Sequence, residues 1–315
     1  MDIEIKKINV KYKKKILKLH KDAFNQTRSS KYWDWRFNNQ SLRKPFGQLA
    51  ITNNRIISHY IVQPIIYKKK DRKIKILMSM WTMTHPKYFN KGLMKILSKK
   101  TFESNKQKKY QWVIAFANKR SIEFFINKLQ FKKIKTMTET TLNLDNNQKF
   151  ENKYKILKIK IFDSSFTRFC NSNVQLKKKY YNPRTSKFLN WRYIQRPKNE
   201  YICYKIINGK KLEGYFILKK YEKKCQIIDF VLTNKSEIYE SVLNKTVEFT
   251  KKNKLSRISL WANSDKKFLK YLQKNRFVEK EMNTYFIIKE LENSYKNKIP
   301  SFDKWYITMG DSDVF

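Results

Sequence analysis

Hydrophobic and polar residues follow two different periods along this chain. Apolar side chains at every second position, or in short β-branched runs, predict strands, whereas apolar side chains three or four positions apart predict amphipathic helices. The first half contains both kinds, in the order strand, two helices, hairpin, strand, helix, strand, helix and two strands. The segments are residues 3–8, 12–24, 30–37, 48–52 with 56–67, 77–83, 93–105, 111–116, a short helix after 118, and 132–137 with 139–144. This order predicts a mixed α/β fold.

The second half repeats the order of the first. Its predicted segments are residues 154–162, 186–193, 201–207 with 212–221, 226–232, 236–252, 257–261, a helix ending before 277, and strands to about 291. Three local matches support the repeat, in the same order and at nearly equal separations. They are SKYWDWRF at 30–37 with SKFLNWRY at 186–193, Phe116-Ala117-Asn118 with Trp261-Ala262-Asn263, and Phe131 with Phe277. Such ordered self-similarity indicates a duplicated domain.

The boundary between the copies is predicted in the polar stretch 145–152. We therefore expect one domain over residues 1–148, a second over 149–292, and a tail over 293–315. The apolar run Trp305-Tyr306-Ile307 predicts that this tail docks on the domains rather than fraying, although a solvated end is the usual state of a terminus. Two acids, Asp311 and Asp313, and the terminal carboxylate would then be available to an amine in an acceptor site.

Composition excludes several other classes of protein. With 315 residues, 41% of them hydrophobic, the chain can bury two cores, so disorder is not expected despite the high charge. The net charge of +45 would attract any polyanion, but the lysines are spread over the whole chain. No basic recognition helix or aromatic RNA-binding signature accompanies them, so a nucleic-acid partner is not expected.

Cysteine usage and hydropathy indicate the compartment. Cys170, Cys203 and Cys225 lie far apart with no Cys-x-x-Cys pair, which argues against a disulfide framework or a metal site. The N-terminus lacks the apolar core of a signal peptide, and no apolar stretch approaches the roughly 18–20 residues that span a bilayer. A cytoplasmic protein without a membrane span or a metal is predicted.

Residues 76–97 contain the strongest candidate for a ligand site. A β-rich run leads through Thr84-His85-Pro86 into a short loop, and Gly92, one of only 5 glycines, precedes a helical pattern. A strand, a tight loop and a helix start form a socket for an anionic phosphate, because backbone N–H groups and the positive end of the helix dipole both face the ligand.

Two blocks of this chain resemble the GNAT superfamily of N-acetyltransferases. Residues 84–94, THPKYFNKGLM, are similar to its acyl-CoA loop, and residues 117–131, ANKRSIEFFINKLQF, to its second block, Asn-x-x-Ser/Ala ending in Leu-Gly-Phe. The resemblance implies two tandem GNAT-like domains, each a mixed, mostly antiparallel sheet flanked by helices. The second copy keeps the strand and helix, but its loop Thr233-Asn234-Lys235-Ser236 has no glycine. It is therefore interpreted as a degenerate domain that shapes the acceptor site.

The resemblance also implies a site for acetyl-CoA as acyl donor. Pantetheine would lie beside the backbone of Thr82, Met83 and Thr84, and Asn118 would bond to its arm. The remaining expected contacts are Phe89, Asn90, Lys91, Gly92, Leu93, Met94, Ser121 and Phe125. Phe89, Asn90 and Met94 depart from the commonest loop residues, and Phe125 stands where the superfamily often has a tyrosine acid.

Two residues are candidates for the chemistry. His59, on the strand next to the expected thioester, would act as the base, and Asp34, which is Asn190 in the second copy, would serve the acceptor. A packed strand histidine is the alternative for His59, and His20 is expected to be an ordinary surface residue. The predicted activity is acyl transfer from acetyl-CoA to a small amine, with an amino sugar of surface-polysaccharide synthesis as the first guess. A non-catalytic acyl-CoA-binding or partner-binding protein is the alternative.

Overall fold

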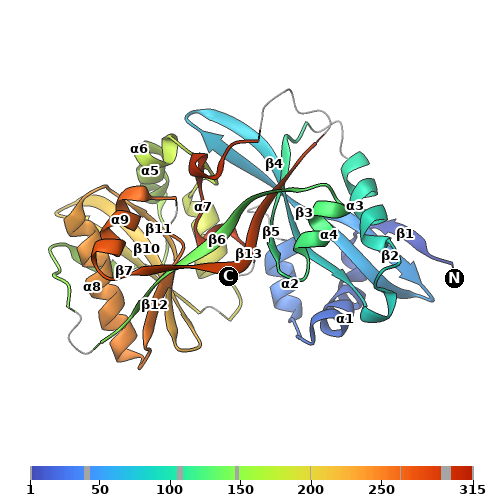
Figure 1. Cartoon of the computed structure of the whole chain (residues 1–315), viewed down its shortest axis with the longest axis horizontal. Helices are drawn as coiled ribbons and strands as arrows, with labels where there is room; N and C mark the ends of the chain where they lie inside the picture. The colour runs from blue at the N-terminus through green and yellow to red at the C-terminus, as the bar shows by residue number, and fades with distance from the viewer. Residues whose placement is uncertain are drawn as a thin grey trace. The chain divides into compact units, whose positions relative to one another are not determined.

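The computed structural model describes residues 2–38, 43–104, 109–145, 149–198, 200–262, 264–291 and 299–313. The chain forms two compact units (Figure 1). Unit 1 comprises Met1–Tyr67, Lys73–Lys135 and Tyr285–Ile299, and unit 2 comprises Lys68–Arg72, Thr136–Thr284 and Pro300–Phe315. Each unit therefore takes in a segment from the opposite half of the sequence.

Unit 1 contains a sheet in the order β1-β2-β3-β4-β5-β13. β1 pairs with β2 and β2 with β3 in antiparallel fashion, whereas β4 and β5 are parallel. Its elements are β1 (Glu4–Lys7), η1 (Val10–Tyr12), α1 (Lys13–Phe24), α2 (Ser30–Phe37), β2 (Phe46–Thr52), β3 (Arg55–Lys69), β4 (Arg72–Thr84), η2 (Pro86–Tyr88), α3 (Leu93–Glu103), β5 (Trp112–Asn118), α4 (Ile122–Asn127), the start of β6 (Lys132–Asn143) and the end of β13 (Val278–Glu290).

Helices cover both faces of this sheet. Alternate residues of a strand point to opposite faces, and accordingly Leu49 and Ile51 of β2 pack with α1 and α2, whereas Ala50 packs with α3 and α4. Gly47 in the same strand allows close approach of β3, because a Cβ there would lie 2.0 Å from the Tyr60 carbonyl oxygen. The sheet therefore lies between α1 and α2 on one face and α3 and α4 on the other.

Unit 2 contains a sheet in the order β6-β12-β11-β10-β9-β7, in which only β11 and β12 are parallel. Ile238 and Val242 of α8 and Phe268 of α9 pack on one face of it, and Phe166 of α5 packs against Tyr215 of β10. Its further elements are β7 (Lys155–Lys158), α5 (Ser164–Ser172), α6 (Val174–Lys177), β8 (Tyr180–Tyr181), α7 (Ser186–Leu189), η4 (Asn190–Ile194, a π-helix), β9 (Tyr201–Asn208), β10 (Lys211–Tyr221), β11 (Lys224–Leu232), α8 (Ser236–Lys252), β12 (Arg257–Leu260), α9 (Lys266–Lys274), η5 (Phe302–Lys304), β14 (Trp305–Tyr306) and η6 (Met309–Asp311).

The mixed fold class, with mostly antiparallel sheets flanked by helices, is confirmed. The pair of strands predicted at the end of each half is wrong, since each pair is one continuous strand, β6 or β13. No glycine or proline interrupts either segment, so nothing in the backbone forces a turn. The helices α5 and α6 were not predicted.

The compact units differ from the predicted ranges 1–148, 149–292 and 293–315. The change of unit falls inside β6, after Lys135, and β13 passes into unit 1 at Tyr285. Each of these two strands therefore contributes residues to both units. Residues 146–148 of the predicted boundary, residues 292–298 and 314–315 of the tail, and Asn263 of the repeat lie outside the described residues.

Among the helices of the described residues, none is both long and apolar enough to cross a membrane.

Candidate functional site

The parallel strands β4 and β5 diverge toward their carboxyl ends. Their pairing runs from Ile76 with Trp112 to Met78 with Ile114. β4 then continues to Thr84 and β5 to Asn118. The recorded pairing therefore ends at Met78 and Ile114, before either strand ends.

Trp81 interrupts β4 on this diverging stretch. Its φ of 51° is left-handed, which is unusual for a bulky residue and marks a local irregularity in the strand. The Trp81 carbonyl oxygen accepts a hydrogen bond from Nδ1 of His59, at 2.9 Å. Its ring lies nearly parallel to that of Tyr32, with centroids 5.7 Å apart. The strain is thus held by contacts on both sides, a condition often found at functional sites.

The loop after β4 has left-handed backbone and leads directly into an uncapped helix. Asn90 and Gly92 have φ angles of 62° and 70°, and Gly92 directly precedes α3. No side chain caps this helix. Within the described part of the chain, the N–H groups of residues 90–94 have no acceptor. Unpaired amides at the start of a helix bind anions.

Charge and space around the loop favour the same kind of ligand. The side chains of Lys91 and Lys95 are exposed beside the helix start. A Cβ added to Gly92 would meet nothing within 4 Å, so its α-hydrogens face open space. The Phe89 side chain is 56% exposed, so its ring is available to an apolar part of a ligand.

Asn118 and Ser121 form a compact turn at the end of β5. The Asn118 Oδ1 atom accepts hydrogen bonds from the N–H groups of Arg120 and Ser121 and from the Ser121 hydroxyl, at 3.0–3.1 Å. The Asn-x-x-Ser spacing therefore shapes the entry to α4, and Ser121 acts by holding Asn118. Because Oδ1 is occupied in this way, Nδ2 is the atom that Asn118 can offer to a ligand in the gap.

The side chains of the other expected contact residues pack in the hydrophobic cores. Leu93, Met94 and Phe125 belong to the core between the sheet and helices α3 and α4. Met83 is buried with α1 and α2. Leu93, Met94 and Met83 can therefore present only backbone groups to a ligand, and Phe125 is a core residue whose ring packs edge-on against Phe131.

His59 is fully buried on β3. Its Nδ1 bonds to the Trp81 carbonyl oxygen, and its Nε2 has no partner among the described residues. Burial lowers the pKa of His59 to about 4, so the imidazole is neutral at pH 7. Since the bond to Trp81 uses the Nδ1 proton, the unpaired Nε2 carries a lone pair.

Asp34 lies in a half-exposed ion pair, whereas His20 is buried. Asp34 on α2 pairs with Lys13 of α1 at 2.7 Å, and its side chain is 47% exposed. No hydrogen bond or ion pair of the described structure joins it to His59. The expectation that His20 is a surface residue is wrong, because it is 5% exposed and packs against the Trp81 ring.

Trp81 and Tyr32 were not identified from the sequence as parts of the site. A tryptophan in a β-rich run gives no signal of left-handed backbone, and an aromatic residue in an amphipathic helix is usually a core residue. Among the described residues, no group of three or more histidine, cysteine or acidic side chains could hold a metal ion.

The first part of the chain matches a known protein family in sequence. Residues 4–125 match the sequence model of the acetyltransferase (GNAT) domain. No protein with a curated description matches the chain in sequence.

Solved structures resemble the whole chain in fold. A probable N-acyltransferase from Enterococcus faecalis aligns with a TM-score of 0.74 at 12% identity, over 93% of this chain and 73% of that one. A GCN5-related N-acetyltransferase from Anabaena variabilis gives 0.72 at 10% identity, over 92% and 73%. N-myristoyltransferase from Saccharomyces cerevisiae, with bound myristoyl-CoA, gives 0.63 at 10% identity, over 92% and 79%. At these identities the likeness concerns the fold. Residues 4–125 are thus similar in sequence to the acetyltransferase (GNAT) domain, and the chain resembles the solved N-acetyltransferase structures in fold.

Proposed function

We infer that the chain transfers an acyl group from an acyl-CoA, with acetyl-CoA as the first candidate, to the amine of a small acceptor. The observation that carries this proposal is the set of unpaired amides at residues 90–94, at the point where β4 and β5 diverge. A diphosphate would bind those amides at the positive end of α3. The attached chain would then enter the gap between the strands.

The pantetheine arm would lie along the end of β4. The backbone of Thr82 and Thr84 borders the gap, and Asn118 Nδ2 would donate to an amide oxygen of the arm from the end of β5. Thr84 is held by its hydroxyl, which lies 2.8 Å from the Ser58 hydroxyl. The arm would therefore meet a rigid edge, which lowers the entropy lost on binding.

His59 would accept a proton from the attacking amine. Its Nε2 lone pair is unpaired and the ring is neutral at pH 7, but the atom is buried, so the side chains that cover it would have to open for an amine to reach it. An imidazole with a pKa of about 4 is a weak base, so it would act when the amine nitrogen becomes acidic during bond formation to the thioester carbon. The thiolate of CoA would leave without help from Phe125, which has no proton to give.

Asp34 would bind a cationic acceptor by exchanging Lys13 for the substrate ammonium. The half-exposed ion pair can open at little cost. Trp33, Trp35 and Arg36 of the same helix are buried, so they do not form an exposed platform for a sugar ring. The proposed acceptor is therefore an amine in general, and an amino sugar is only one example of it.

A non-catalytic acyl-CoA-binding role is the second candidate. It is favoured by the low pKa of His59 and by the lack of a tyrosine at position 125. Both candidates require acyl-CoA binding, and only the first requires thiol release.

The test combines binding and turnover. Acetyl-CoA and myristoyl-CoA are each added in a thermal unfolding assay, with duplex DNA as a polyanion control, because a net charge of +45 attracts any polyanion. Thiol release is then followed with a panel of amines that includes glucosamine. Stabilisation by an acyl-CoA with amine-dependent thiol release supports the transferase. Stabilisation without release supports the binding protein, and an equal effect of DNA and acyl-CoA would refute both.

A further inference from the structure

Unit 2 repeats the strand divergence of unit 1. The parallel pairing of β11 and β12 runs from Lys224 with Arg257 to Ile227 with Leu260. β11 continues to Leu232, whereas β12 ends at Leu260. The recorded pairing therefore ends at Ile227, at the place that corresponds to the proposed pantetheine site of unit 1.

The C-terminal segment of the chain, residues 305–312, bonds to β11 on one side and to the turn after β12 on the other. The Tyr306 hydroxyl donates to the carbonyl oxygen of Phe230 on β11. On the other side, Ile307 N donates to Ser264 Oγ at 2.7 Å, and Ser264 Oγ donates back to the Ile307 carbonyl oxygen at 2.8 Å. The segment thus bonds to β11 beyond its last residue paired with β12, and to Ser264 in the turn that follows β12 and precedes α9.

The same segment is packed as tightly as a core strand. Trp305, Ile307 and Met309 are each at most 1% exposed. Gly310 has no room for a side chain, because a Cβ there would lie 2.1 Å from the Tyr193 hydroxyl and 3.1 Å from Asp229 Cβ. The segment is therefore in close contact with unit 2 at Tyr193 and Asp229.

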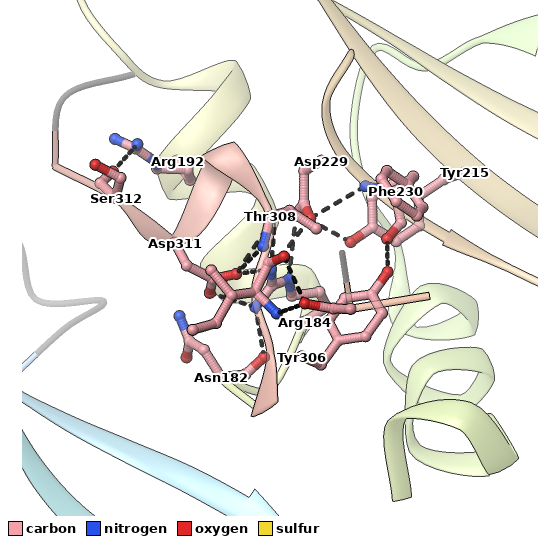
Figure 2. A network of polar contacts seen from close by, with 12 residues as sticks. Asn182, Arg184, Arg192, Tyr215, Asp229, Phe230, Tyr306, Thr308, Asp311 and Ser312 are labelled. Atoms are coloured by element: carbon pink, nitrogen blue, oxygen red, sulfur yellow. Dashed lines mark hydrogen bonds and ion pairs between the residues drawn. The ribbon is translucent and has the colours of Figure 1, made fainter. Parts of the chain in front are cut away.

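A buried ionic network fixes the segment (Figure 2). Arg184 donates to both oxygens of Asp229, at 3.1 and 3.2 Å, and to both oxygens of Asp311, at 2.6 and 2.7 Å. Thr308 donates to Asp229 at 2.8 Å, and the Tyr193 and Tyr215 hydroxyls donate to the same carboxylate. Burial by itself would lower the pKa of Arg184, but the two carboxylates outweigh burial and raise it. Without Asp311 and Thr308, the donors of Arg184 would be only partly satisfied.

The start of α8 in unit 2 is closed to a phosphate. The Glu213 carboxylate, 1% exposed, lies there and accepts hydrogen bonds from the Thr233 hydroxyl at 2.8 Å and from Lys235 Nζ at 3.5 Å. Burial opposes the ionised form, but these donors and Lys211 lower the pKa of Glu213. A buried carboxylate at this helix start would repel a diphosphate.

We propose that residues 305–312 are a built-in ligand of unit 2, which occupies the gap between β11 and β12 and closes that unit to acyl-CoA. The groove keeps its shape, but Arg184 and Asp229 recognise a carboxylate and a hydroxyl of the chain itself. The proposal concerns unit 2 and stands whether or not unit 1 binds acyl-CoA.

Hydrogen exchange of the full chain, with and without saturating acetyl-CoA, tests the proposal. The amides of residues 305–312 are expected to exchange as slowly as those of β11, and acetyl-CoA is expected to leave them unchanged. Rapid exchange of this segment, or its release by acetyl-CoA, would overturn the proposal. Lack of protection at residues 85–94 on adding acetyl-CoA would count only against the function proposed for unit 1.

The variant Gly310→Ala gives a second readout. Its Cβ should force the segment out of the gap and speed exchange of residues 305–312 about tenfold or more, since local opening sets the exchange rate. Exchange of β3 and β4 should not change. Gly209→Ala is the control, because its Cβ would meet nothing within 4 Å. Equal exchange of residues 305–312 in both variants would contradict the proposal.

Discussion

Substitution of Gly92 by valine separates the cost of backbone strain from the cost to ligand binding. Gly92 has a φ of 70°, and Gly209, in the hairpin between β9 and β10, has a φ of 56°. Added side chains meet nothing within 4 Å at either position. Gly92→Val and Gly209→Val therefore place a branched side chain in open space on similarly strained backbone, one in the proposed diphosphate loop and one in a hairpin that belongs to no proposed site.

The expected magnitudes follow from these observations. Left-handed backbone costs a non-glycine residue roughly 1–2 kcal/mol, which is a fall of about 2–8 °C in melting temperature for a domain of this size. Both variants should show this fall in melting temperature. Acetyl-CoA at a hundred times its dissociation constant stabilises the folded state by about 2.7 kcal/mol, or about 5–11 °C. That gain should persist in Gly209→Val and vanish in Gly92→Val, because the valine methyl groups would occupy the position of the diphosphate.

The assay is thermal unfolding of the wild type and both variants, with and without acetyl-CoA. The reasoning is refuted if Gly92→Val keeps the full ligand-induced shift, since the loop would then not contact the diphosphate. It is equally refuted if Gly209→Val loses the shift, because strain alone would then explain the effect.

Three further predictions concern other parts of the structure. Asn118→Asp keeps the acceptor that orders the turn before α4 but loses the Nδ2 donor, so acetyl-CoA affinity measured by calorimetry should fall about tenfold with no change in melting temperature. In urea unfolding, Arg184→Met should cost about 3–5 kcal/mol because it leaves two buried carboxylates unpaired; Asp311→Asn should cost less, about 1–3 kcal/mol, since the arginine keeps one partner, and the reverse order would contradict the network. Burial lowers the folded-state pKa of His59 from 6.5 to about 4, so the unfolded state binds more protons in that window and stability on the order of 3 kcal/mol should be lost as pH falls from 6.5 to 4. His59→Gln, which can still donate to the Trp81 carbonyl oxygen, should flatten this pH dependence of the urea midpoint, and an unchanged slope would show that His59 is not the titrating group.

The loop of unit 1 was the part of the site most open to prediction. Its signals are local, because a glycine before a helix and a strand before the loop determine where backbone amides can point. The Asn-x-x-Ser spacing is also local, and it fixes the turn that presents Asn118.

The properties of His59 were not readable from the chain. Whether a strand histidine is neutral depends on which residues cover it, and the bond from His59 to the Trp81 carbonyl oxygen depends on left-handed backbone at Trp81. The burial of His20 has the same origin, since Trp81 packs against it. No periodicity of residues reports such contacts between separate elements.

The sequence by itself determined the order of most helices and strands and the position of the glycine loop, because each depends on neighbours within about one helical turn or one strand. Tertiary structure decided how β6 and β13 continue from one unit to the other, and it decided where the tail goes. Asp311 lies 127 residues from Arg184, and only folding brings the two into contact. Burial then makes the contact strong, because a carboxylate removed from water requires a partner. The residues of the tail could be read as apolar and acidic from the sequence, but their partners could not.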